Sequence, residues 1–165
     1  MKIQQHIIKV GMADINVVAD SGVLKTTGLG SCVGLSLYDS FNKIAGMAHI
    51  MLPSSDIARI DSLNTAKYAD TAIPELIARM KQLGVNKNRL EAKIAGGAQM
   101  FVFSQQTDTM RIGPRNVEAC TEILNQLSIP IVASDTGGNY GRTIEFYSDS
   151  GKLVVRSVQR GVKEF

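Results

Sequence analysis

The sequence has no tryptophan, and aromatic residues fill only 5% of its 165 positions. Proteins that bind single-stranded nucleic acid combine a basic groove with aromatic side chains on which the bases stack. Lysine and arginine total 18 against 15 aspartate and glutamate, and the basic residues are scattered along the chain. We therefore expect no nucleic-acid partner.

A long apolar run is also missing. No segment reaches the roughly 18 to 20 consecutive apolar residues that a membrane-spanning helix needs. The first residues, 1–6, contain neither the apolar block nor the small-residue cleavage site of a signal peptide. These absences predict a cytoplasmic protein that does not insert into a membrane.

Cysteine and histidine are scarce, with two of each: Cys32, Cys120, His6 and His49. Neither C-x-x-C nor H-x-x-x-H spacing occurs, so the chain cannot assemble the four ligands of a structural zinc site. We predict no metal and no cofactor. Both cysteines are expected to be free thiols in a reducing compartment. Cys120 falls on the apolar stripe of a predicted helix, which makes it a core residue.

Apolar periodicity predicts more strands than helices. Strand-like runs occupy 6–13, 15–19, 32–38, 44–51, 90–95, 129–133, 143–147 and 153–158, and helical spacing covers 65–83 and 116–127. At 44% hydrophobic residues, a chain of this length can bury a real core. We predict a single α+β domain over residues 1–165, with mixed sheets and helices packed outside them. Arg142, just before the run 143–147, is expected to be a solvated charge, with orientation of a substrate acid as the alternative.

One cysteine and one histidine fall in neighbouring strand runs. Cys32 begins the run 32–38, which reads as a half-buried strand, and His49 lies in the run 44–51. A hairpin loop of even length, either 40–41 or 39–42, would place His49 directly opposite Cys32. Opposed residues share a face with Cβ atoms about 4.5 to 5.5 Å apart, so the two side chains would meet. A loop of odd length would put them on opposite faces.

A thiol beside an imidazole suits nucleophilic catalysis, because the imidazole can take the thiol proton and leave a reactive thiolate. Either Thr26 or Thr27 can return beside the pair across 28–30 and orient the imidazole; spacing alone does not choose between them. The glycines of 28–30 also let backbone N–H groups approach a developing oxyanion. The pattern alone fits a buried cysteine beside a histidine with no catalytic role better than it fits a catalytic pair.

The segments 28–34 (GLGSCVG) and 46–53 (GMAHIMLP) resemble the signature of the bacterial chemoreceptor glutamine deamidases, the CheD family. The resemblance continues in order through 67–72, 93–98, 113–117 and 135–138. It implies two packed mixed sheets flanked by helices, and a catalytic triad of Cys32, His49 and Thr26. It also implies the substrate: glutamine side chains on the cytoplasmic helices of chemotaxis receptors, with glutamyl methyl esters as a second substrate to be tested.

Two alternatives differ in class from the deamidase. The resemblance also implies association with a CheC-type chemotaxis phosphatase, so the chain can act as a non-catalytic regulator of that partner. A cysteine peptidase is the third hypothesis, and it would shorten its substrate instead of changing a side chain. Replacing Cys32 with alanine distinguishes the first two, because binding requires a surface and not a thiolate.

Overall fold

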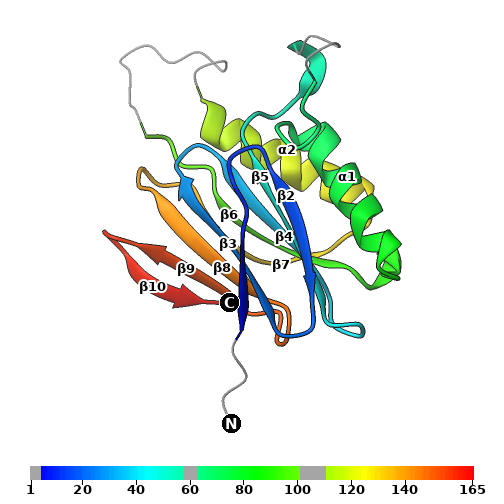
Figure 1. The fold of residues 1–165 in the computed structure, drawn as a ribbon. Coiled ribbons are helices and arrows are strands. Elements are labelled where there is room, and N and C mark those ends of the chain that lie inside the picture. The colour runs from blue at the N-terminus through cyan, green and yellow to red at the C-terminus, as the bar shows by residue number, and fades with distance from the viewer. Residues whose placement is uncertain (1–4, 58–62, 101–110) are drawn as a thin grey trace.

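Ten strands form two five-stranded sheets in the computed structural model, which describes residues 5–57, 63–100 and 111–165 (Figure 1). The outer sheet has the order β1 (His6–Lys9), β3 (Gly22–Leu29), β8 (Arg142–Tyr147), β9 (Leu153–Ser157), β10 (Gly161–Glu164). The central sheet has the order β2 (Ile15–Ala19), β5 (Ile44–Ile50), β4 (Val33–Asp39), β6 (Glu91–Gly96), β7 (Ile131–Thr136). Each sheet is mixed, since β1–β3 and β6–β7 are parallel pairs and the other pairs are antiparallel.

Both long helices, α1 (Ala69–Gln82) and α2 (Ile112–Gln126), cover the same face of the central sheet (Figure 1). Two short 3-10 helices, η1 (Ser55–Ile57) and η3 (Lys87–Arg89), lie in the connections. The molecule is therefore layered as helices, central sheet and outer sheet. The predicted α+β class with two packed mixed sheets is confirmed, and the helices flank the sheets on one side.

The layers enclose two apolar cores. One lies between the helices and the central sheet and includes Leu35 and Leu76; the other lies between the sheets and includes Phe146. All seven residues of β4 are buried, because this strand is in the middle of the central sheet and is covered on both faces. The expectation of a half-buried strand was wrong for that reason. Successive side chains of β4 point alternately into the two cores, and neither face of the strand is exposed to solvent.

Most predicted elements are present with shifted ends. Helix α1 begins four residues later than the apolar spacing predicted, and it continues through Pro74. Helix α2 begins four residues earlier than predicted, because Gly113 and Pro114 are accommodated in its first turn. Strand β10 was not predicted: its four residues are all exposed, so they carry no apolar alternation.

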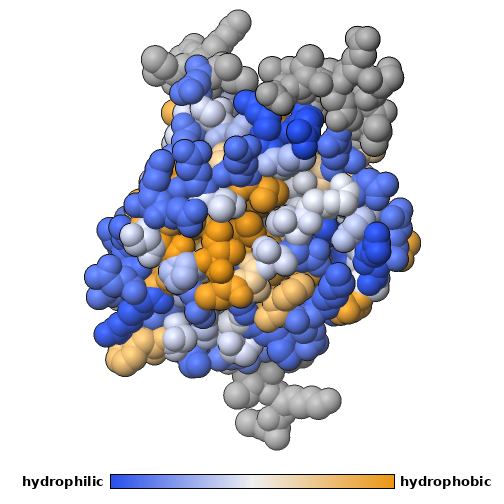
Figure 2. All heavy atoms as spheres, turned by 180° about the vertical axis from the view of Figure 1, so that it is seen from behind, coloured by the Kyte–Doolittle hydropathy of each residue, from blue (hydrophilic) through white to orange (hydrophobic). Residues whose placement is uncertain are grey.

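The surface is mixed in character. Among the described residues, no helix is long and apolar enough to cross a membrane. Figure 2 shows one face on which hydrophobic side chains gather at the centre and hydrophilic residues surround them. Such a patch is typical of a surface that another protein covers.

Candidate active site

The side chains of Thr26 and His49 meet between the two sheets. Thr26 comes from β3 of the outer sheet and His49 from β5 of the central sheet. The Oγ1 atom of Thr26 lies 2.7 Å from Nδ1 of His49, and it also donates a 2.7 Å hydrogen bond to the carbonyl oxygen of Val10. Both side chains are enclosed, with Thr26 2% and His49 0% exposed. A buried polar contact thus joins the sheets at this point.

The structure distinguishes the two candidate threonines. Successive strand residues point to opposite faces, so Thr26 is buried between the sheets and Thr27 is exposed. The pairing of β3 with β8 is irregular between Thr26 and Leu29, where Gly28 has φ +72°. A bulge therefore follows Thr26 where a plain turn was expected. The chain then leaves the outer sheet and enters the central sheet at Val33.

The register of the β4–β5 hairpin differs from the prediction by two residues. His49 pairs with Gly34, because Asp39 pairs with Ile44 and the loop is 40–43. The carboxylate of Asp39 holds this loop by accepting hydrogen bonds from the backbone N–H groups of Phe41 and Asn42. The loop is still even in length, so the predicted shared face stands.

Cys32 is consequently a diagonal neighbour of His49 on the face toward the outer sheet. It precedes β4, is 7% exposed and packs in the core between the sheets. Diagonal strand neighbours lie about 7 to 8 Å apart, within reach of longer side chains. The Nε2 atom of His49 is buried and has no hydrogen-bond partner among the described residues. Nε2 of His49 therefore keeps its hydrogen-bonding capacity in the core that Cys32 also lines.

Burial sets the charge state of the pair. It raises the pKa of the Cys32 thiol and lowers the pKa of the His49 imidazole, because each charged form loses solvation. At neutral pH both shifts favour a neutral thiol beside a neutral imidazole over a thiolate–imidazolium pair. Within the ranges that the structure describes, no three histidine, cysteine or acidic side chains cluster as metal ligands.

Asn116 is a site residue that the sequence reasoning missed. It lies in the second turn of α2 and is fully buried, where apolar spacing gave only the start of a helix. Its Nδ2 atom donates to the carbonyl oxygens of Ser31 and Met51, at 2.9 and 3.0 Å. These two residues lie next to Cys32 and two residues after His49. The signal available in the sequence was the position of this polar residue inside 113–117, one of the segments that carry the family resemblance.

Arg142 is buried, and the expectation of an exposed charge was wrong. Its side chain is 1% exposed, and its Nη2 atom lies 3.1 Å from Oδ1 of Asp135. Asp135 continues a row of paired residues across the central sheet that starts at His49 and passes through Gly34 and Ala95. An ion pair therefore joins the sheets at one end of this row, as the Thr26 contact does at the other.

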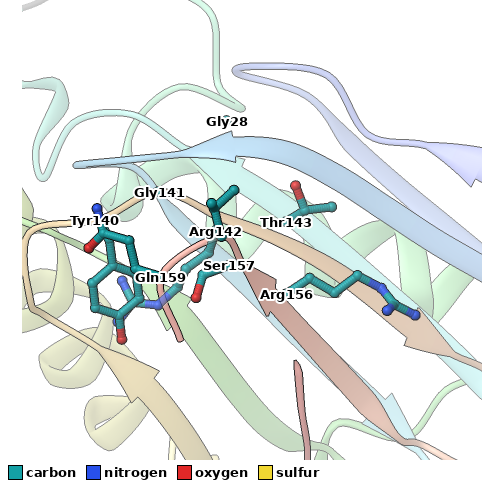
Figure 3. A pocket seen from close by; sticks show the side chains of 9 residues that line it. Gly28, Tyr140, Gly141, Arg142, Thr143, Arg156, Ser157 and Gln159 are labelled. Atoms are coloured by element: carbon teal, nitrogen blue, oxygen red, sulfur yellow. The ribbon is translucent and has the colours of Figure 1, made fainter. Parts of the chain in front are cut away.

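A pocket of about 550 Å³ opens beside this ion pair (Figure 3). Its walls come from Gly28, Tyr140, Gly141, Arg142, Thr143, Arg156, Ser157, Val158 and Gln159. Neither Cys32 nor His49 lines it, so it is separate from the thiol–imidazole pair. The Arg142 guanidinium lies over the ring of Tyr140, 4.2 Å from its centroid.

Comparison with known proteins shows the family of this chain. Residues 51–157 match a family model described as CheD chemotactic sensory transduction. The chain belongs to the CheD family. A CheD relative of Halalkalibacterium halodurans, named chemoreceptor glutamine deamidase, is 53% identical over 96% of this chain and 98% of its own length. The Bacillus subtilis protein of the same name is 48% identical over 95% of each chain.

The family model covers only part of the candidate site, whereas the relatives cover nearly the whole chain. The model begins at residue 51, after the thiol–imidazole pair, and includes Asn116, Asp135 and Arg142. A relative from Caldanaerobacter subterraneus, named probable chemoreceptor glutamine deamidase CheD, is 54% identical over 97% of this chain and 98% of its own. CheD membership therefore rests on nearly the full length of the chain.

Proposed function

We propose that this chain is a chemoreceptor glutamine deamidase that works through Cys32, His49 and Thr26. Two CheD relatives about half identical to it over nearly their whole length carry the name chemoreceptor glutamine deamidase. The observation that carries the residue assignment is the pair of short hydrogen bonds at the Thr26 hydroxyl. A protein-glutamine deamidase needs an activated nucleophile and a group that protonates departing ammonia, and a cysteine–histidine pair can supply both.

The Thr26 hydroxyl determines which imidazole nitrogen carries the proton. A hydroxyl has one hydrogen, and the carbonyl oxygen of Val10 can only accept a hydrogen bond. Because Thr26 donates to Val10, its contact with His49 must run the other way, from the Nδ1–H of the imidazole to Oγ1. The lone pair of the neutral imidazole is then on Nε2. Thr26 thus holds His49 in the tautomer that can accept a proton from Cys32.

The reaction follows from this arrangement in two stages. The Cys32 thiol gives its proton to Nε2 of His49 while the sulfur attacks the carbonyl carbon of a glutamine carboxamide. The resulting imidazolium then protonates the amine of the tetrahedral intermediate. Ammonia departs, and the acyl group remains bound to Cys32 as a thioester. In the second stage His49 takes a proton from water, which attacks the thioester. Glutamate is released as Cys32 recovers its proton.

The backbone N–H of Gly30 is not one of the oxyanion donors in this arrangement, because it donates to the carbonyl oxygen of Gly28 at 3.0 Å. We expected the glycines of 28–30 to bring N–H groups to the oxyanion. We now assign that role to the peptides after Gly30. The N–H of Cys32 has no acceptor among the described residues, which supports assigning it this role.

The relatives' names supply the class of substrate, and the sequence resemblance supplies the location. We propose that the chain acts as one deamidase domain over residues 1–165, in the cytoplasm, on glutamines of the receptors' cytoplasmic helices. A glutamyl methyl ester presents the same carbonyl carbon, so esters at those positions are a second substrate to be tested. The hydrophobic patch in Figure 2 supports a protein-binding role as well, and a CheC-type phosphatase is the partner that we propose for it.

Intact-mass spectrometry of a receptor cytoplasmic fragment tests the proposal. Incubation with the wild-type protein is expected to add about one mass unit for each glutamine converted to glutamate, as hydrolysis of an amide requires. Cys32→Ala should add none while keeping its fold. Cys120→Ala is the matched control, since Cys120 is fully buried in the helix-side core. An unchanged mass with the wild-type protein, or a gain that survives Cys32→Ala, overturns the assignment.

A further inference from the structure

Three successive carbonyl groups just before and at Cys32 are all held by hydrogen bonds. Gly30 accepts from the Ala98 backbone N–H at 2.8 Å, Ser31 from Nδ2 of Asn116 at 2.9 Å, and Cys32 from the Gly97 backbone N–H at 2.8 Å. The first and third bonds come from the backbone that follows β6. The Ser31 carbonyl is the one held by a side chain.

The side-chain amide nitrogen of Asn116 makes hydrogen bonds that offset the cost of burying it. The residue is 0% exposed, and its Nδ2 atom donates to both Ser31 and Met51. Its Oδ1 atom is buried and has no hydrogen-bond partner among the described residues. A buried amide that uses its nitrogen in this way ties the strand end after His49 to the peptide before Cys32. Both acceptors are backbone carbonyl oxygens, so the tie fixes main-chain positions whatever side chains those residues carry.

The planarity of the peptide bond extends this effect to Cys32. In a trans peptide the C=O and the following N–H lie in one plane and point in opposite directions. The carbonyl of Ser31 and the N–H of Cys32 belong to the same peptide. When Asn116 holds the carbonyl, it also fixes the direction in which the Cys32 N–H points, on the side away from α2. In cysteine and serine hydrolases the nucleophile's own N–H commonly helps to bind the oxyanion.

We propose that Asn116 is a positioning residue that aims the Cys32 N–H at the oxygen of the substrate carboxamide. This inference rests on the proposed deamidase function and adds a residue to it. The hydrogen bond to that oxygen strengthens as negative charge develops during attack. The effect of Asn116 therefore falls on the rate of the chemical step and not on substrate binding.

Helix α2 has other anchors, so the role of Asn116 is not simply to hold the helix. Gly113 packs directly against the carbonyl oxygen of Ala98. Cys120 and Leu124, both 0% exposed, fix the following turns in the helix-side core. Loss of the Asn116 amide removes two hydrogen bonds and leaves these contacts in place.

The test compares deamidation with alkylation of the same thiol. For Asn116→Ala, kcat on a receptor fragment is expected to fall about 10- to 100-fold, somewhat less than the loss of a whole oxyanion donor, because the donor is misaligned and not removed. KM should stay within about threefold, as expected when an interaction made in the transition state is lost. Alkylation of Cys32 by iodoacetamide should also stay within about threefold, because displacement of iodide creates no oxyanion.

Thr121→Val is the matched control. It removes a 2.8 Å hydrogen bond from α2 to the carbonyl oxygen of Val117, within the same helix and away from Cys32. It should leave kcat and alkylation unchanged. Peptide mass mapping also detects alkylation of Cys120, which reports any unfolded fraction. If Asn116→Ala is not native by circular dichroism, Asn116→Asp, which keeps the shape of the side chain, is assayed in the same way.

Each outcome decides the inference. A fall in kcat with preserved alkylation supports it. Equal falls in kcat and alkylation show that Asn116 acts on the thiol–imidazole pair and overturn it, as does full activity in the variant. Two variants that both fail to fold show a purely structural role and overturn it too. If the wild-type protein releases no ammonia, the deamidase function itself fails, which is a separate result.

Discussion

Gly96 lies so close to Cys32 that a Cβ atom at Gly96 would overlap the carbonyl oxygen of Cys32. Gly96 has φ +105°, which side chains rarely permit, and the N–H of Gly97 donates to the same carbonyl oxygen at 2.8 Å. The end of β6 therefore serves as a backbone support for Cys32, the proposed nucleophile. Its glycines matter because they let two main chains approach closely.

Gly96→Ala should lower both stability and deamidation, because the new methyl group must displace the Cys32 backbone. The matched control is Gly84→Ala. Gly84 has φ +95°, close to that of Gly96, but an added Cβ there meets nothing within 4 Å. The control should cost about 1 kcal/mol of unfolding free energy from backbone strain alone and keep full activity. Urea denaturation and ammonia release measure the two effects. Equal loss of activity in both variants would refute the close-approach argument.

Thr26→Val should reduce kcat about 10- to 100-fold, the usual cost of losing a partner that orients a functional histidine. Valine keeps the shape of threonine but cannot accept the Nδ1–H of His49, so the required tautomer loses its support. The Val10 carbonyl oxygen also loses its donor, which should lower the unfolding free energy by about 1 to 3 kcal/mol. Thr27→Val, on the exposed face, is the control. Unchanged kcat in Thr26→Val would remove Thr26 from the site.

Deamidation should have a broad bell-shaped dependence on pH. Burial lowers the pKa of His49 below its usual 6.5 and raises that of Cys32 above its usual 9.0. Reaction requires a neutral imidazole and a protonated thiol, so kcat/KM rises through the first pKa and falls through the second. Iodoacetamide alkylation of Cys32 should be slow at neutral pH and still be rising at pH 9, because the thiolate fraction grows until the pH passes the raised pKa of the thiol. Fast alkylation at pH 6 would indicate a thiolate–imidazolium pair and contradict the neutral resting state.

The same shift at His49 links stability to pH. The folded pKa lies below the unfolded one, so the unfolded chain binds a proton more readily. The stability that the neutral His49 imidazole contributes is fully present above pH 6.5. It is lost as the pH falls through the folded pKa of His49. His49→Gln should therefore unfold with a weaker pH dependence below pH 6.5 than the wild-type protein, as denaturant titrations at several pH values would show.

Asp135→Asn should destabilise the protein strongly, by about 3 to 5 kcal/mol, because it leaves the enclosed guanidinium of Arg142 without its carboxylate. Glu145→Gln gives the comparison. Glu145 pairs with Arg156 at 2.9 Å, but the Arg156 side chain is 51% exposed, so water replaces the lost partner. Thermal unfolding of the two variants should differ clearly. Similar melting temperatures would show that the buried Arg142–Asp135 pair stabilises the protein no more than the exposed Arg156–Glu145 pair.

Local patterns in the sequence predicted the face that Cys32 and His49 share but not their spacing. The strand runs around Cys32 and His49 and the even loop between them placed both side chains on one face, and the structure agrees. The register failed by two residues, because Asp39 holds the loop with side-chain hydrogen bonds that strand periodicity does not encode. Strand periodicity thus predicted the face that the two side chains share, while the hydrogen bonds of the turn set the register of the hairpin.

Long-range contacts explain the remaining differences. Arg142 is charged and adjoins glycines, which favours exposure, yet a carboxylate from β7 reaches it in the interior. Asn116 is polar within an amphipathic helix, and its two acceptors come from segments 85 and 65 residues away. No local pattern reports such a partner. Thr26 was separated from Thr27 only by the resemblance, and in the structure strand alternation turns Thr26 toward His49 while Thr27 is exposed.

The row that runs from His49 through Gly34 and Ala95 to Asp135 is bound to the outer sheet at both ends, by Thr26 and by Arg142. Between them, Gly34 has no room for a side chain, since a Cβ there would lie 2.5 Å from Cδ1 of Ile144. Sliding one sheet over the other by a fraction of a residue would break both links at once. The proposed active site therefore depends on the alignment of the two sheets, and we expect heating to abolish deamidation before the chain unfolds.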